Sequence, residues 1–167
     1  MSRRDEQFTT YVVERRPHLF RAALLMSGGD AHRAEDVVQQ ALAKLYAAWP
    51  RVSRVDQVDA YVRRVLLHAH IDEGRRPWRR ERAADPTSAS LDRPAAAGVS
   101  SEDSDALWAA LRSLAPGQRR VVVLRHFWGL SVEETAVDLG ISPGTVKSQT
   151  SAALAHLRDT LLDGATR

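Results

Sequence analysis

The side chains best suited to chemistry in this sequence of 167 residues are arginines grouped around one tryptophan. Arginines occupy five of the eight positions from Arg75 to Arg82, and Trp78 lies among them. Arginine donates to phosphate oxygens in a fixed fork, and tryptophan can stack on an unpaired base. The segment therefore suits a nucleic-acid backbone with melted or flipped bases. The alternative is a helix end whose arginines face water.

A predicted helix-turn-helix near the C-terminus carries a second group of polar residues. Ser131 and Glu134 have the spacing of a capping box at the start of its first helix. Gly140 stands where a helix ends in a left-handed residue. Ser142 is expected to cap the second helix, with Pro143 at its first position. Because the second helix of such a unit enters a DNA major groove, this spacing predicts DNA binding.

The second helix of this unit has one face suited to reading bases. The face consists of four residues at i, i+3, i+4 and i+7, namely Thr145, Ser148, Gln149 and Ala152. Gln149 can pair with adenine through two hydrogen bonds, and Lys147 beside this face can reach guanine or phosphate. Val146 on the opposite face and Ile141 in the turn are expected to be buried. A helical hairpin that binds only protein is the alternative.

Neither a catalytic site nor a metal site is predicted. His68 and Asp72 share one face of a predicted helix, but His70 points away, and two ligands on one turn make a poor metal site. The sequence has no cysteine, which excludes disulfides, thiol nucleophiles and cysteine-based zinc sites. It also lacks the motifs of serine hydrolases, phosphate-binding glycine loops and zinc proteases, so no cofactor is expected.

Charge and composition divide the sequence into three parts. The formal charge of +3 at pH 7 is distributed as +5 over residues 1–80, −3 over residues 81–104 and +1 over residues 105–167. Residues 82–104 are rich in Ala, Ser, Pro and Asp, and they contain too little apolar surface to offset the entropy of ordering. We therefore predict a flexible acidic linker over 82–104, between one domain at 1–81 and another at 105–167.

Both domains are predicted to be helical. In the first domain, Asp30 is expected to cap a helix with one apolar face, and Pro50 is expected to end it. Pro17 either kinks an earlier helix or starts a new one. In the second domain, residues 121–124 could form a buried strand, but no other segment offers a strand partner, so a helix is preferred. The expected fold class is all-α, with two small helical domains.

The sequence predicts no membrane association. No segment is apolar over the roughly 18 residues needed to cross a bilayer. The first residues lack the apolar region of a signal peptide. Since the chain also has no cysteine, the expected location is the cytoplasm.

The order of these elements resembles that of bacterial RNA polymerase sigma factors of the small group 4, extracytoplasmic-function type. Residues 34–49, which begin AEDVVQQ, resemble the polymerase-binding helix of that family. Residues 61–76 are similar to its −10-reading helix. Residues 114–125 (LAPGQRRVVVLR) and 144–149 (GTVKSQ) are similar to its −35-reading domain.

The resemblance implies a non-enzymatic subunit of RNA polymerase that recognises promoter DNA and melts the −10 element. In this family the first domain docks on the clamp helices of the β′ subunit and captures non-template bases of the −10 element. The second domain contacts the β flap and places its helix in the −35 major groove. The expected location is the cytoplasm, where the protein associates with the nucleoid through RNA polymerase. Control by an anti-sigma protein is left open.

The resemblance also implies three sets of contact residues. Polymerase-binding residues are Asp36, Gln39, Gln40 and Lys44. Contacts to −10 DNA come from Arg63, His68, Asp72, Arg75, Arg76, Trp78, Arg79 and Arg80. Contacts to −35 DNA come from Thr145, Lys147, Ser148, Gln149 and Ala152. Without the resemblance, the polar residues around Asp36 would be either a solvated helix surface or a protein-docking face.

The sequence departs from the family pattern at several positions. His68 stands where the family commonly has asparagine. Gln149, Ala152 and His156 stand where many members carry arginine. Fewer fixed charges on this helix predict weaker phosphate anchoring at the −35 element. Three other interpretations are a stand-alone helix-turn-helix regulator, an adaptor that binds only protein, and an enzyme with a site at His68 and Asp72.

Overall fold

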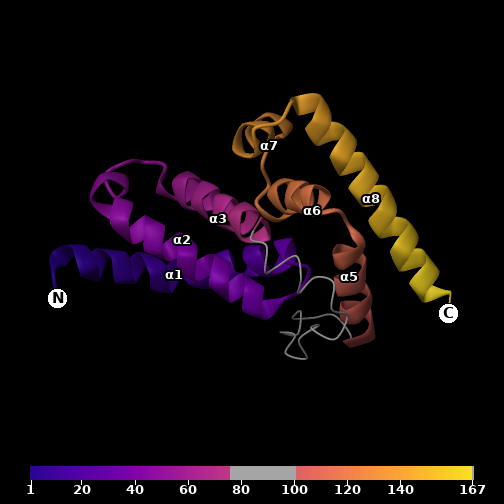
Figure 1. Cartoon of the computed structure of the whole chain (residues 1–167), viewed down its shortest axis with the longest axis horizontal. Helices are drawn as coiled ribbons and strands as arrows, with labels where there is room; N and C mark the ends of the chain where they lie inside the picture. The colour runs from indigo at the N-terminus through magenta and orange to yellow at the C-terminus, as the bar shows by residue number, and fades with distance from the viewer. Residues whose placement is uncertain (76–100, 167) are drawn as a thin grey trace. The chain divides into compact units, whose positions relative to one another are not determined.

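The computed structural model describes residues 1–75 and 101–166, and every regular element in these two ranges is helical. The chain divides into two compact units, Met1–Asp92 and Arg93–Arg167 (Figure 1). The predicted linker lies almost entirely outside the described residues. Its last four residues, 101–104, form the first turn of a helix instead. Within the described ranges, no helix is both long enough and apolar enough to cross a membrane.

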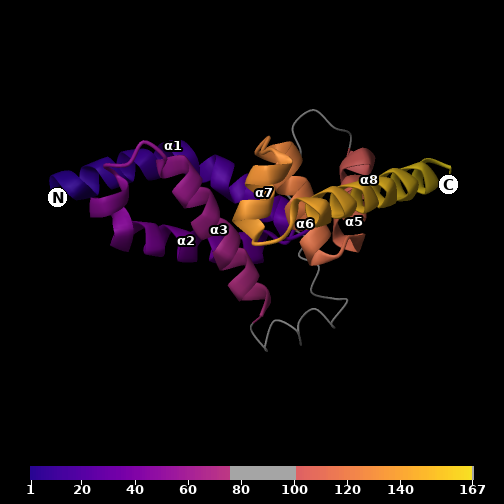
Figure 2. The same ribbon diagram turned by 90° about the horizontal axis from the view of Figure 1, so that it is seen from above.

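The described part of the first unit is built from three helices. They are α1 (Arg3–Met26), α2 (Ala31–Val52) and α3 (Val58–Gly74). Helix α2 packs against both α1 and α3, and Figures 1 and 2 show it beside both of them. Apolar side chains from all three helices fill the space between them, among them Leu24, Val37, Leu45, Leu66 and Leu67. Burial of this apolar surface is the main term that stabilises the unit.

The start of α2 matches the sequence prediction. Gly28 and Gly29 adopt φ angles of 64° and 89°, which turn the chain between α1 and α2. Such angles favour glycine because other residues meet a steric penalty there. The Asp30 side chain then accepts a hydrogen bond from the backbone N–H of Arg33 at 3.0 Å. The predicted cap at Asp30 is therefore confirmed.

Pro17 and Pro50, the two prolines among the described residues of the first unit, do not interrupt their helices. Pro50 was expected to end α2, but the helix continues to Val52. A proline has no N–H, so the carbonyl of Tyr46, four residues earlier, loses its helical donor. Arg4 of α1 replaces that donor, with its Nη2 atom 2.6 Å from the Tyr46 carbonyl oxygen. Pro17 lies inside α1 and does not start a new helix.

Helix α1 is attached to both other helices by aromatic side chains. The ring centroid of Trp49 in α2 lies 5.4 Å from that of Phe8 and 5.2 Å from that of Tyr11. The Tyr11 hydroxyl donates to the Asp59 carboxylate in α3, with an O–O distance of 2.7 Å. Burial, together with this nearby carboxylate, raises the pKa of Tyr11 above its ordinary value of 10.0.

The second unit contains five described helical elements. They are α5 (Ser101–Ser113), α6 (Pro116–Val122), the π-helical turn η2 (Val123–Phe127), α7 (Val132–Leu139) and α8 (Pro143–Ala165). Helix α8 packs against α5, α6 and α7 (Figure 2). Residues 121–124 are helical, which confirms the helix prediction for this apolar segment.

A small apolar cluster holds α6, α7 and α8 together. Val121, Ala136 and Val146 are its buried members, one from each helix. Ile141, in the turn between α7 and α8, packs against this cluster but is only half-buried, so the prediction of a buried residue there was wrong. The turn lies at the edge of the unit, where one side of the isoleucine remains open to solvent.

Candidate nucleic-acid interface

The helix-turn-helix in the second unit is formed by local backbone contacts. The Ser131 hydroxyl accepts from the N–H of Glu134 at 3.0 Å, which confirms the serine half of the predicted capping box. Gly140 has φ 65° and ψ 36°, the left-handed conformation expected of it. The Ser142 hydroxyl accepts from the N–H of Thr145 at 3.1 Å, with Pro143 in the first turn. The start of α8 is thus fixed before any ligand arrives.

The predicted reading face of α8 is partly exposed and partly held against the unit. Lys147, Ser148 and Ala152 are exposed, whereas Thr145 and Gln149 are half-buried. The Ser148 hydroxyl donates to the Thr145 carbonyl at 3.1 Å. Three of the five predicted residues are therefore fully available to a ligand without rearrangement.

Gln149 leans toward the start of α6. A Cβ atom added at Gly117 would lie 3.8 Å from Nε2 and 3.9 Å from Oε1 of Gln149. These distances are ordinary van der Waals contacts, so the amide lies directly over the glycine. The Gln149 amide thus packs beside the surface of α6, close enough that a side chain at position 117 would touch it.

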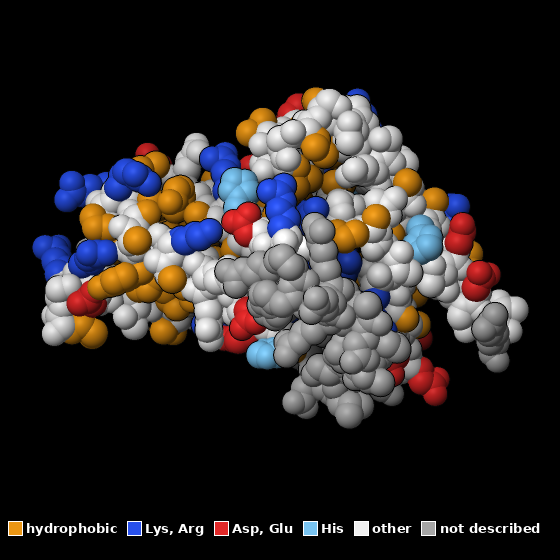
Figure 3. Space-filling view, viewed as in Figure 1, with side chains coloured by type: hydrophobic (Ala, Val, Ile, Leu, Met, Phe, Trp, Pro, Cys, Tyr) orange, Lys and Arg blue, Asp and Glu red, His pale blue; other side chains and the backbone are white. Residues whose placement is uncertain are grey.

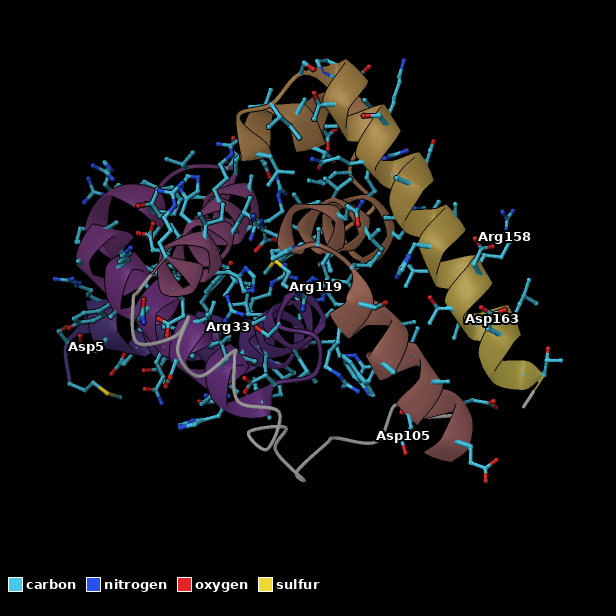
Figure 4. All side chains as sticks on the ribbon, turned by 45° about the vertical axis from the view of Figure 1, so that its right-hand side comes forward. Asp5, Arg33, Asp105, Arg119, Arg158 and Asp163 are labelled. Atoms are coloured by element: carbon cyan, nitrogen blue, oxygen red, sulfur yellow. The ribbon has the colours of Figure 1, made fainter. Side chains whose placement is uncertain are left out.

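The C-terminal half of α8 is attached to α5 by a histidine. His156 Nε2 lies 2.8 Å from Ser113 Oγ. Since the Ser113 hydroxyl donates to the Ala110 carbonyl at 2.7 Å, it accepts from His156. Further along α8, Arg158 and Asp163 are both exposed (Figure 4). His156 is therefore an exposed residue that links α8 to α5 through one hydrogen bond, while the last turns of α8 carry charged groups into solvent.

The predicted polymerase-binding residues on α2 are not one uniform exposed face. Gln39 and Lys44 are exposed, whereas Asp36 and Gln40 are half-buried. Gln40 Nε2 donates to Glu73 Oε2 of α3 at 2.7 Å. Lys44 Nζ lies 3.8 Å from an Asp72 carboxylate oxygen. Two of the four residues thus contact α3 through their side chains.

The predicted −10 residues are only partly within the described ranges. His68, Asp72 and Arg75 are exposed on α3 or at its end, and Arg63 is half-buried. The other four residues lie outside the described residues, namely Arg76, Trp78, Arg79 and Arg80. The described members lie on one helix and lead directly into the arginine-rich segment.

The histidines of α3 point in different directions, as the spacing predicted. His68 is exposed, while His70 is 1% exposed and faces the core. Among the described residues, no group of three His, Cys, Asp or Glu side chains is arranged to hold a metal ion.

The sequence reasoning missed one ionisable residue, Glu73. Its side chain is 1% exposed and accepts from Gln40. A helical pattern could have revealed it, because Glu73 continues the buried row of Val62, Leu66 and Ala69 at helical spacing. A carboxylate at the end of an apolar row is uncommon unless it has a specific partner.

Positive charge in the first unit extends beyond the predicted −10 residues. Figure 3 shows Lys and Arg side chains over the end of the unit that carries the N-terminus and the α2–α3 turn. The exposed residues Arg3, Arg51 and Arg54 belong to these segments. Such charges attract nucleic acid without reading its sequence, so they assist association more than recognition.

Family models match both units. The model described as Sigma-70 region 2 matches residues 12–80, and the model described as Sigma-70, region 4 matches residues 104–157. The RNA polymerase sigma-E factor of Streptomyces coelicolor is 39% identical over 158 residues, which cover 93% of this chain and 86% of that protein. The ECF RNA polymerase sigma factor SigL of Mycobacterium tuberculosis is 33% identical over 167 residues, which cover 89% of this chain and 86% of that protein.

Solved structures have the same arrangement of helices. The sigma factor RpoE of Bartonella quintana, in complex with the anti-sigma factor NepR, has a TM-score of 0.72 at 26% identity, covering 93% of this chain and 97% of that chain. CnrH, in complex with the cytosolic domain of CnrY, has a TM-score of 0.61 at 24% identity. The match covers 95% of this chain and 89% of the CnrH chain. The CnrH comparison shows a shared fold.

The helical units and their matched regions define a non-catalytic transcription initiation factor. The chain belongs to the sigma-70 family of RNA polymerase sigma factors, and its relatives identify the extracytoplasmic-function type. It acts in promoter recognition and transcription initiation, and its partners are core RNA polymerase and promoter DNA. The predicted fold class and function are confirmed, and the interpretations as an enzyme, an adaptor or a stand-alone regulator are set aside.

Proposed function

We propose that the two units divide promoter recognition between them. The domain at 1–81 binds the clamp helices of the β′ subunit and captures non-template bases as the −10 element melts. The domain at 105–167 contacts the β flap and binds the −35 element. Residues 82–104 connect them, although the helix that starts at Ser101 shortens the connecting segment. Held on one enzyme, two modest DNA contacts act together as a linked pair.

The observation that carries the −35 assignment is the capped start of α8. Ser142 and Pro143 fix the first turn, and the exposed Lys147 and Ser148 stand directly after it. Backbone N–H groups at a helix start favour a phosphate, and the adjacent side chains can then meet base edges. Gln149 reads one base pair after its amide turns away from Gly117. Thr145 and Ala152 complete the contact surface.

The −10 assignment is supported by where α3 ends. Exposed His68 and Asp72 lie on its last turns, and Arg75 follows at its end. The chain then continues into the segment with Trp78, whose side chain is suited to stacking on an unpaired base. In this proposal, His68 and Asp72 contact displaced bases, while Arg63 and the arginines after residue 74 neutralise phosphates.

Polymerase binding is assigned to three predicted residues of α2. Gln39 and Lys44 are exposed, and Asp36 is half-buried. Lys44 is close to Asp72 across an exposed surface, with both side chains 56% exposed. An ion pair of this kind is weak and exchanges partners easily. Contact with polymerase can therefore release Asp72 toward DNA.

Regulation is proposed by analogy with the structural relative. The sigma factor RpoE of Bartonella quintana is bound by the anti-sigma factor NepR in its solved structure. We propose that an anti-sigma protein similarly restrains this chain. The proposed location is the cytoplasm, with nucleoid association through polymerase.

Run-off transcription with core polymerase tests the proposal. The wild-type protein should direct initiation at a subset of promoters from a genomic library. Gln149→Ala should change the preference at one −35 base pair by about 1–3 kcal/mol and leave other positions unaffected. Ser151→Ala, at an exposed position of the same helix, is the matched control. Equal loss on all promoters would assign Gln149 a role other than reading, and failure to co-elute with core polymerase would reject the function itself.

A further inference from the structure

The last turn of α3 is fastened to α2 by polar side chains. Gln40 of α2 donates to the Glu73 carboxylate at 2.7 Å. Arg33 lies about two turns before Gln40 on α2. Its Nη2 atom is close to Gly74, the residue after Glu73, because a Cβ atom added at Gly74 would be 3.1 Å from that nitrogen. Because Gly74 has no side chain, Arg33 keeps this position without the shift of a few tenths of an ångström that a Cβ atom would require. These contacts join residues that are more than thirty positions apart in the sequence.

A buried carboxylate imposes strict requirements on its surroundings. Glu73 is 1% exposed, and its Oε2 atom accepts from the Gln40 amide in place of water. A hydrogen bond to a charged acceptor is stronger and more directional than one between neutral groups. Losing such a donor leaves the buried Oε2 atom without that hydrogen bond, which is costly. The Gln40 amide therefore restricts where Glu73 can lie.

The position of Glu73 determines the orientation of residues proposed to contact DNA. Asp72 precedes it and Arg75 follows it by two positions, on the outer side of the same turn. Residues of one helical turn move together, so a displaced Glu73 would rotate both neighbours. The −10 surface is consequently oriented from inside the unit by a side chain of α2.

We propose that Gln40 and Glu73 are a positioning pair for promoter melting. Gln40 acts on the −10 surface through Glu73, and its main role is not direct contact with polymerase. This inference rests on the proposed function, in which α2 binds polymerase and the end of α3 contacts −10 DNA. It reassigns one residue of the predicted docking set and adds Glu73, for which no role was predicted.

Exchanging the two side chains tests the pair. Gln40→Glu brings two carboxylates together, whereas the double variant Gln40→Glu with Glu73→Gln restores one donor and one acceptor in reversed order. Two measurements are needed, namely affinity for core polymerase and the rate of −10 opening on duplex promoter. Gln40→Glu should slow opening about tenfold, the equivalent of losing one buried hydrogen bond to a charge. The double variant should recover most of that rate.

Affinity for core polymerase separates this role from direct docking. For a positioning pair, Gln40→Glu should change core affinity by less than about threefold, well below its effect on opening. Gln7→Glu, the same substitution at an exposed position of α1, is the control and should change neither measurement. Where Gln40→Glu unfolds the unit, Gln40→Met removes the donor without adding a charge and should also slow opening.

Three outcomes would overturn the inference. Unchanged opening in Gln40→Glu and Gln40→Met would show that the pair does not orient the −10 surface. A loss of core affinity that the double variant fails to restore would make Gln40 a docking residue. Slow opening in the double variant, equal to that of Gln40→Glu, would mean that the pair itself is not the cause. Failure of the wild-type protein to bind polymerase or open promoters would instead reject the proposed function.

Discussion

The two units build their candidate DNA surfaces in different ways. In the second unit, the start of α8 is fixed by Ser142 and Thr145, which are three residues apart in the chain. In the first unit, the end of α3 is fixed by Gln40, which is 33 residues away from Glu73. The −35 surface is thus locally encoded, whereas the −10 surface depends on how two helices pack.

This difference has a physical consequence for each surface. A helix start fixed by its own cap persists as long as the turn before it keeps its backbone conformation. A surface fixed by a contact between helices changes whenever the helices shift relative to each other. In the proposed function, duplex reading at −35 requires a rigid element, while capture of melted bases benefits from a surface that responds to the polymerase binding proposed for α2.

The largest effect that tests this comparison is expected at Gly140. Gly140→Ala places a Cβ atom on a residue with φ 65°, although nothing lies within 4 Å of that position. The cost is therefore purely conformational, roughly 1–2 kcal/mol of unfolding free energy. Hydrogen exchange should show faster opening of α7 and α8 and unchanged exchange in α1 to α3. Promoters that depend on the −35 element should lose most activity.

Gly164→Ala is the matched control for this variant. A Cβ atom at Gly164 also meets nothing within 4 Å, but that residue lies in helix α8 with a helical backbone. Alanine there should stabilise the helix by up to roughly 1 kcal/mol. Equal destabilisation by the two variants would contradict the assignment of a left-handed constraint to Gly140.

A smaller effect is expected from removing the cap of α8. Ser142→Ala deletes the acceptor for the Thr145 N–H and should cost about 1 kcal/mol of unfolding free energy. Binding to an isolated −35 duplex should weaken, while binding to single-stranded −10 DNA should not. Ser151→Ala removes a hydroxyl from an exposed position in the same helix and should be neutral. Parallel losses on both DNA types would mean that the surfaces are not independent.

The smallest effect is expected at the exposed ion pair of the first unit. Lys44→Met removes the partner of Asp72, but both side chains are 56% exposed. The change in unfolding free energy should stay below about 0.5 kcal/mol and shrink further in high salt, because exposed pairs are screened. Chemical denaturation at two ionic strengths measures both quantities. A salt-independent loss above about 1 kcal/mol would place Lys44 with Gln40 among the residues that hold α3.

Features encoded within a few residues could be predicted from the sequence. Asp30, Ser131 and Ser142 each cap the helix that follows them, and Gly140 adopts the left-handed conformation expected of it. Caps and left-handed turns depend on a residue and its immediate neighbours, so one sequence contains the necessary information. The all-α fold class followed from the helical spacing of apolar residues in the same way.

Features that depend on distant contacts could not be predicted in the same manner. Pro50 was expected to end α2, yet Arg4 supplies a donor to the carbonyl that the proline leaves without one. Helical spacing places Glu73 on the buried row of α3, but its hydrogen-bond partner, Gln40, lies on another helix and cannot be inferred from that spacing. Gln149 is half-buried, and its amide lies beside Gly117 of a different helix, α6. The role of each described site residue remains a prediction until the variants above are measured.

The glycine beneath Gln149 has a consequence for how this sigma factor can change its targets. Gly117→Ala would set a methyl group 3.8 Å from the Gln149 amide nitrogen. That distance is an ordinary van der Waals contact, so the methyl group would pack against the amide in its present position. A substitution at position 117 would therefore hold the predicted reading residue more firmly against the unit, which offers a route to altered promoter preference that leaves the sequence of α8 unchanged.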